Sequence, residues 1–89
     1  MRAVITVIGR DTVGILAKVS AKCAEHHINI QEVTQSILQE LFVMMMMVDV
    51  SGSDIPFTEF ADLMTALGQS ERLSIHTMHE DIFNSMHTI

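Results

Sequence analysis

The fold of this chain is decided by the stretch Ile8–Leu16, IGRDTVGIL, where an alternating apolar run gives way to a helical pattern across a short polar connection. The run before it, Ala3–Ile8, is rich in β-branched residues, which is typical of a strand. Asp11 or Thr12 is expected to cap the helix that follows, because each side chain offers an oxygen to the free N–H groups of a helix start. We call residues 9–16 the corner.

The corner has two interpretations. A helix start presents backbone donors and the positive end of the helix dipole, which suits an anionic group such as a carboxylate. Gly14 has no Cβ and would let a ligand approach the backbone closely. Helix capping and helix-to-sheet packing explain the same residues without any ligand. The corner by itself leaves both interpretations open.

The size and composition of the chain predict one small domain that covers residues 1–89. Hydrophobic residues make up 48% of the chain, and its mean hydropathy is +0.34. These values are high for a protein with so much surface relative to its volume. We therefore expect part of the apolar surface to close against a second copy or another partner.

Charge and sulfur content restrict the partners and the compartment. The formal net charge is -6 and the five basic residues are dispersed, so no nucleic acid is expected as a partner. A single cysteine and eight methionines favour the reducing cytoplasm. The apolar run at the N-terminus is too short to cross a membrane and resembles no signal peptide, so we expect a soluble chain with no membrane partner.

The middle of the chain predicts a helix and two strands. Apolar residues recur at helical spacing over Val13–His26. The half-polar stretch Ile28–Ile37 predicts an edge strand, and a change in its alternation predicts a bulge near Gln31 or Glu32. The stretch Leu41–Val50 is apolar on both faces, as expected of a central strand that follows a tight hairpin turn.

The remainder predicts a helix, a strand and a short terminal helix. A helical pattern after Pro56 continues to Gly68, which is placed to end it. Alternation over Arg72–Met78 predicts a fourth strand, and residues 80–88 a short helix packed on the rest. The order predicts an α+β fold, the ferredoxin-like βαββαβ sandwich, with a four-stranded antiparallel sheet and two helices on one face. Right-handed crossovers place the first and third strands in the middle.

Catalytic and metal-binding patterns are weak in this sequence. His76 and His79 have a spacing seen in metal ligands, but residues three apart on a strand point to opposite faces. Cys23 lies in the apolar stripe of the first helix and is expected to be a buried hydrophobic residue. No nucleophile is paired with a base. We therefore expect no catalytic residue, no metal site and no cofactor.

The segments Ile5–Leu16 and His27–Ile30 resemble the ACT domain, and the similarity covers nearly the whole chain. Thr12 and Val13 stand where the family commonly has Arg-Pro. With the tail Ile82–His87, the chain is similar to small stand-alone bacterial ACT proteins of the glycine cleavage repressor type. The resemblance implies a regulatory module that binds an amino acid or similar small ligand, usually as a homodimer, without catalysis of its own.

Strand directions add a geometric argument for the dimer. The corner follows the first strand and Asn29 opens the second, and these two strands run parallel, so the corner and Asn29 lie at opposite ends of one sheet. Antiparallel pairing of two edge strands about a two-fold axis would bring one corner toward the partner's Asn29. The expected ligand-binding residues are Asp11, Thr12, Val13, Gly14 and Ile15 of one subunit, with Asn29 of the other.

The main alternative is a protein-interaction module without a small ligand. In that hypothesis the open, methionine-rich face of the sheet docks a partner, such as a regulated protein. Methionine suits such a surface because its side chain adapts to different partners. Charged replacements at Met44 or Met46 are then expected to abolish association while the domain stays folded.

Overall fold

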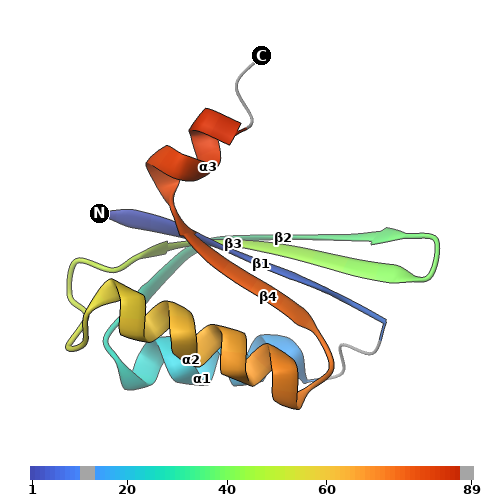
Figure 1. Ribbon diagram of the computed structural model, residues 1–89, viewed down its shortest axis with the longest axis horizontal. Coiled ribbons are helices and arrows are strands. Elements are labelled where there is room, and N and C mark those ends of the chain that lie inside the picture. Colours follow the sequence, from blue (N-terminus) through green and yellow to red (C-terminus); the bar gives the residue numbers. More distant parts are fainter. Residues whose placement is uncertain (11–13, 87–89) are drawn as a thin grey trace.

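The computed structural model describes residues 1–10 and 14–86, and it contains the predicted order of strands and helices (Figure 1). A helix at the C-terminal end follows the βαββαβ unit, as expected. The elements are β1 (Arg2–Gly9), α1 (Ile15–Glu25), β2 (Asn29–Leu38), β3 (Leu41–Asp49), α2 (Phe57–Ser70), β4 (Ser74–His79) and α3 (Glu80–Met86).

The four strands form one sheet in the order β2-β3-β1-β4, and every neighbouring pair is antiparallel. The prediction that the first and third strands are central is confirmed, and β2 is an edge strand. Its register against β3 shifts between Ile30 and Glu32, which confirms the predicted bulge. Ile30 and Val33 are three positions apart and would point to opposite faces of a regular strand. Because the bulge adds one residue between them, both face the core side of the sheet.

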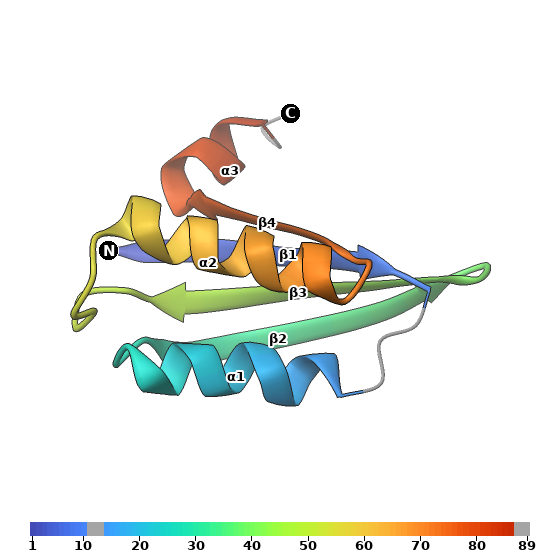
Figure 2. The same cartoon turned by 60° about the horizontal axis from the view of Figure 1, so that its bottom comes forward.

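Helices α1 and α2 cover one face of the sheet, whereas α3 rises on the other side (Figures 1 and 2). We call the face away from α1 and α2 the open face. The core between the sheet and the two helices includes Phe60 and Met64 of α2 and alternate residues of β3. Those residues of β3 are Met44, Met46 and Val48, each 0% exposed.

The positions of the methionines correct one expectation. Met44 and Met46 are core residues, so they cannot form the docking surface that the alternative hypothesis assigned to them. Met45 and Met47 are the methionines that face away from the helices, and both are partly exposed. Asp49 lies two positions after Met47 and points to the same face, and a carboxylate favours the face of a strand that is exposed to solvent.

Two helix boundaries also differ from expectation. The N-cap of α1 is Gly14 and the helix begins at Ile15, whereas the expected caps, Asp11 and Thr12, lie outside the described residues. Gly68 lies inside α2, which continues to Ser70. Gly68 is buried because β4 passes close to it: an added Cβ would lie 2.8 Å from the carbonyl oxygen of Leu73. This glycine serves close packing and does not end the helix.

Helix α3 contacts β1 and β4, yet none of its described residues is buried. Ile82 and Met86 are exposed, and Ile89, predicted to share their stripe, lies outside the described residues. Among the helices of residues 1–10 and 14–86, none has the length and apolar character needed to cross a membrane.

Candidate ligand-binding site

The end of β1 is held tightly against the connection between α2 and β4. An added Cβ at Gly9 would lie 1.9 Å from Leu73 Cδ2, so only glycine fits without displacing this leucine. Arg10 is the last described residue of the corner on the β1 side. The predicted site residues Asp11, Thr12 and Val13 lie outside the described residues.

Gly14 and Ile15 form the described part of the predicted site. Gly14 has a φ of 76°, in the left-handed region that favours glycine, and its surroundings are open. Its carbonyl accepts a hydrogen bond from the N–H of Lys18 at 3.1 Å. The Ile15 side chain is 3% exposed, so this residue can offer a ligand only its backbone.

The start of α1 is suited to an anion for two reasons. The N–H groups of its first turn have no acceptor within the helix, because no turn precedes them. The first turn also contains no acidic side chain that would compete for these donors. A small carboxylate could therefore bind to the backbone here, supported by the helix dipole.

Asn29 lies at the opposite end of the same sheet. It is exposed at the first position of β2, opposite Asp49 of β3, whereas Gly9 at the end of β1 is opposite Phe42. The predicted separation is thus confirmed, and one chain does not bring Asn29 to its own corner. A site made from both needs a second subunit.

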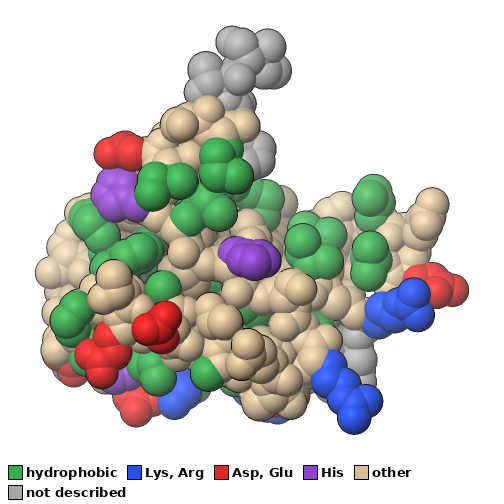
Figure 3. Space-filling model, viewed as in Figure 1, with side chains coloured by type: hydrophobic (Ala, Val, Ile, Leu, Met, Phe, Trp, Pro, Cys, Tyr) green, Lys and Arg blue, Asp and Glu red, His purple; other side chains and the backbone are tan. Residues whose placement is uncertain are grey.

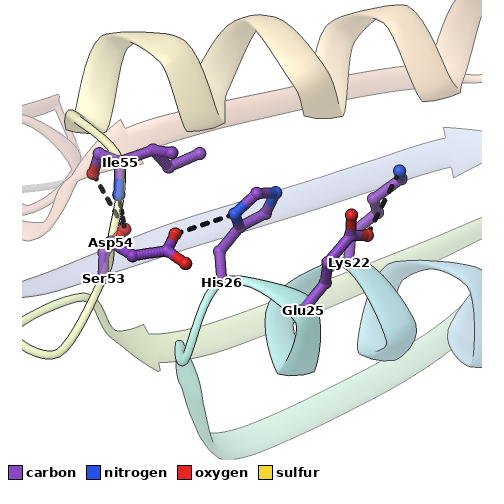
Figure 4. Close-up of polar contacts among 6 residues, drawn as sticks. All are labelled: Lys22, Glu25, His26, Ser53, Asp54 and Ile55. Atoms are coloured by element: carbon purple, nitrogen blue, oxygen red, sulfur yellow. Dashed lines mark hydrogen bonds and ion pairs between the residues drawn. The ribbon is translucent and has the colours of Figure 1, made fainter.

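The position of Asn29 depends on the junction between α1 and β2. His26 Nδ1 and Asp54 Oδ1 are 2.9 Å apart, and the N–H of Asp54 donates to the carbonyl of His26 (Figure 4). The N–H of Ile28 donates to the carbonyl of Cys23 at 2.8 Å. These bonds attach the start of β2 to the end of α1 and to the loop before α2, which limits the positions that Asn29 can take.

Asp49 provides a charged group beside Asn29 that the sequence did not single out. Its Oδ1 accepts hydrogen bonds from Ser51 Oγ at 2.6 Å and from the Ser51 N–H at 2.9 Å. These bonds hold the pKa of Asp49 below its ordinary value of 3.8. The N-terminal ammonium lies 3.7 Å from the same oxygen. A carboxylate at this end of the sheet is therefore ionised and attracts cationic groups.

Two of the hollows on the surface of the described residues bear on the site. One, of about 650 Å³, opens at the end of β1, where the corner begins; its lining comprises Ile8, Gly9, Arg10, Leu41, Glu71, Arg72, Leu73 and Ser74. We call it the corner hollow. The other, of about 130 Å³, lies on the open face, where Phe83 of α3 meets side chains of the sheet that include Val4, Met45 and Met47.

The groups considered for catalysis or metal binding are not arranged for either role. Cys23 is buried, and burial raises the pKa of its thiol to about 11, so the reactive thiolate is scarce at neutral pH. His76 and His79 both lie within β4 and therefore point to opposite faces. In the part of the chain that the structure describes, no three His, Cys, Asp or Glu residues are grouped to hold a metal ion.

Comparison with known proteins agrees with the fold. Residues 2–80 match the model of the ACT domain family. A UPF0237 protein of Listeria innocua is 48% identical over 89 residues, covering 100% of both chains. A UPF0237 protein of Methanopyrus kandleri is 38% identical over 88 residues, covering 99% of this chain and 98% of the relative.

Solved structures agree as well. An ACT domain protein from Streptococcus pneumoniae superposes with a TM-score of 0.81 at 40% identity, covering 93% of each chain. A putative glycine cleavage system transcriptional repressor superposes with a TM-score of 0.70 at 24% identity, covering 89% of this chain and 47% of the other. This second likeness concerns the fold alone.

Proposed function

Because the chain belongs to the ACT domain family, we propose that it is a cytoplasmic regulatory module that binds an amino acid or a similar small ligand as a homodimer. Its activity is to change shape or association on binding, without catalysis of its own. The carboxylate of the ligand binds the backbone N–H groups at the start of α1. The amide of the partner's Asn29 binds the other end of the ligand.

The observation that carries the dimer is the exposed edge strand β2. From Gln31 to Leu38 every residue of this strand is exposed. On its core side, the apolar side chains of Val33 and Ile37 are 38% and 75% exposed, and Leu16 of the neighbouring α1 is 39% exposed. An exposed edge with apolar side chains beside it favours pairing with a second chain.

A two-fold axis at this edge completes the ligand site. Antiparallel pairing of two β2 strands continues the sheet from four strands to eight and places equivalent surfaces against each other. Each corner then approaches the Asn29 end of the partner's β2. The Asp49 carboxylate beside that asparagine attracts the ammonium group of an amino acid.

A thermal-shift screen of the amino acids tests the binding. At a hundredfold excess over Kd, a ligand specific for the folded state adds about 2.7 kcal/mol. For a chain of this size that raises Tm by roughly 10 °C or more. Asn29→Ala should weaken the shift, whereas Thr58→Ala, at an exposed position of α2, should leave it intact. If no amino acid at millimolar concentration raises Tm, the proposal is wrong.

The dimer is tested by measuring the mass in solution. We expect a dimer for the unchanged chain and a monomer for Ile37→Glu, because pairing would bury the new carboxylate of each subunit against the Asn29 end of the partner's β2. Ile37 is so exposed that the fold should tolerate the change. Thr58→Glu adds the same charge on α2 and should remain dimeric. A dimer that persists in both variants excludes this edge as the interface.

The open face supports a second candidate function, the docking of a partner protein. Ile8, Leu38 and Leu41 are exposed large apolar residues on this face, and the hollow beneath Phe83 continues the apolar surface. Met45→Glu or Met47→Glu should then abolish association with the partner without unfolding the domain. Association that survives both changes would exclude this surface.

A further inference from the structure

The corner hollow contains two arginines that no acidic side chain of the described residues neutralises. Arg10 follows β1 and Arg72 follows α2, and both line the hollow. The three other basic residues each form an ion pair: Arg2 with Glu80, Lys18 with Glu71 and Lys22 with Glu25. In a chain with a formal net charge of -6, the two arginines that form no ion pair with a described residue thus line the same hollow.

The acidic residue that lines the hollow with them already has a partner. Glu71 also lines the hollow, but its carboxylate pairs with Lys18 of α1. Glu40, in the turn between β2 and β3, forms no ion pair with a described residue. Figure 3 shows two groups of Lys or Arg atoms at this end, and the group nearer the projecting hairpin lies against Asp or Glu atoms. Among the residues that line the corner hollow, the two arginines outnumber the one carboxylate, that of Glu71.

The fold does not require an arginine at position 72, because its backbone conformation favours glycine. Its φ is 59°, in the left-handed region where glycine is the ordinary residue after a helix. The N–H of Leu73 donates to the carbonyl of Gly68 at 2.8 Å, the bond that closes such a helix end. A side chain at this position strains the backbone, so the arginine is unfavourable for the helix end itself.

The rest of the lining suits a short aliphatic chain that ends in an anion. Ile8, Leu41 and Leu73 supply apolar surface, and the volume of about 650 Å³ is in the range of small-molecule sites. Guanidinium groups bind carboxylates through two parallel hydrogen bonds. The hollow ends at Arg10, near the beginning of the corner, and the proposed α-carboxylate site lies later in the corner, at the start of α1.

We propose that the corner hollow binds a second carboxylate of the ligand, so that the ligand class is an acidic amino acid. The α-carboxylate occupies the start of α1 and the side-chain carboxylate lies between Arg10 and Arg72. This inference rests on the proposed function and names the ligand class of the same site. It also explains why the two arginines have no ion-pair partner within the described residues.

Calorimetric titration of the full chain tests the preference directly. Glutamate and aspartate are compared with glutamine and asparagine, which have nearly the same shape without the charge. We expect at least one acid to bind about tenfold or more tightly than its amide. Arg10→Gln and Arg72→Gln should each remove most of this preference, measured as the ratio of the Kd of the amide to the Kd of the acid. Lys22→Gln removes the same charge on α1 and should preserve the preference.

A second variant separates binding from stability. Arg72→Gly should raise the Tm of the free protein, because glycine tolerates the left-handed backbone, and should still remove the preference for the acid.

This inference is overturned, and the proposed function left intact, if acid and amide bind equally well or if the preference survives both glutamine variants. Chains that bind no amino acid at all would defeat both. Inorganic phosphate is titrated in parallel, and phosphate binding that glutamate and aspartate cannot compete would overturn the carboxylate assignment.

Discussion

Arg2 and Glu80 join the start of β1 to the start of α3 through two hydrogen bonds. Arg2 Nε donates to Glu80 Oε2 at 2.7 Å, and Nη2 donates to Oε1 at 2.5 Å. The hydrogen bonds from Arg2 hold the pKa of Glu80 below its ordinary value of 4.5. Because α3 has no buried residue among those described, this pair is an important attachment of the helix to the sheet.

Acidification should loosen α3 before the rest of the fold. A carboxyl with a lowered folded-state pKa stabilises the fold fully above its unfolded value of 4.5, and this contribution is lost as the pH falls through the lower folded-state pKa. Amide hydrogen exchange by NMR should show several-fold weaker protection of α3 below that range. Glu80→Gln should weaken α3 already at neutral pH and remove the acid dependence, whereas Glu59→Gln in α2 should not. An acid dependence that is unchanged in Glu80→Gln would contradict the role of this pair.

Gly14→Ala should destabilise the free protein by about 1 kcal/mol, because the Cβ of alanine crowds the neighbouring carbonyl oxygen in the left-handed conformation. No atom lies within 4 Å of the added Cβ, so no clash contributes. Gly14→Asn should cost less, since asparagine tolerates this conformation better. Urea unfolding measures both changes. Equal stability of all three proteins would show that the backbone at residue 14 adopts another conformation in solution.

Gly68→Ala should destabilise the fold although alanine is the better helix former by about 1 kcal/mol. The added Cβ would lie 2.8 Å from the Leu73 carbonyl oxygen and 2.9 Å from Ile75 Cγ1, so α2 and β4 must separate. We expect a net loss of about 1–3 kcal/mol in chemical unfolding. The exposed neighbour Gln69→Ala should change stability by less than about 0.5 kcal/mol. A stabilising Gly68→Ala would show that the two elements are not in close contact.

The Cys23 thiol should resist labelling in the native protein at pH 8. It is 1% exposed, and burial raises its pKa to about 11. A thiol reagent should therefore react slowly with the folded chain and at once after addition of guanidinium. Ala21→Cys places a second thiol at an exposed position of the same helix, and that thiol should react rapidly without denaturant. Rapid labelling of the unchanged native chain would contradict the burial of Cys23.

Much of the fold follows from local patterns. The half-polar β2 and the change in its alternation predicted an edge strand with a bulge, and both are present because side chains of a strand point alternately to its two faces. The helical spacing predicted α1 and α2 in the same way. Helix ends were less predictable: the N-cap position of α1 is Gly14, and α2 continues past Gly68 to Ser70, since close packing against β4 and not helix termination requires that glycine.

The candidate site was predictable only in part. The corner and Asn29 were identified, and their separation within one chain followed from the strand directions. Arg10 and Arg72 were not, because each is an ordinary surface residue in the sequence and nothing in their spacing relates them. The parity of Asp49 with Met45 and Met47 was the available signal for which methionines face away from the helices.

The sequence by itself determined the order of the elements and the central and edge strands, because these depend on periodicity within short segments and on the handedness of crossovers. The family followed from the resemblance of Ile5–Leu16 and His27–Ile30 to the ACT domain. Only the tertiary structure decided which face of β3 the helices cover, because the strand is apolar on both sides over Leu41–Val48 and Asp49 at its end is the one polar residue that distinguishes them. It also decided that Arg10 and Arg72 line one hollow. Packing of α2 and β4 against the end of β1 brings the two arginines to that hollow. Residues so distant in the chain come together only when the whole sheet forms.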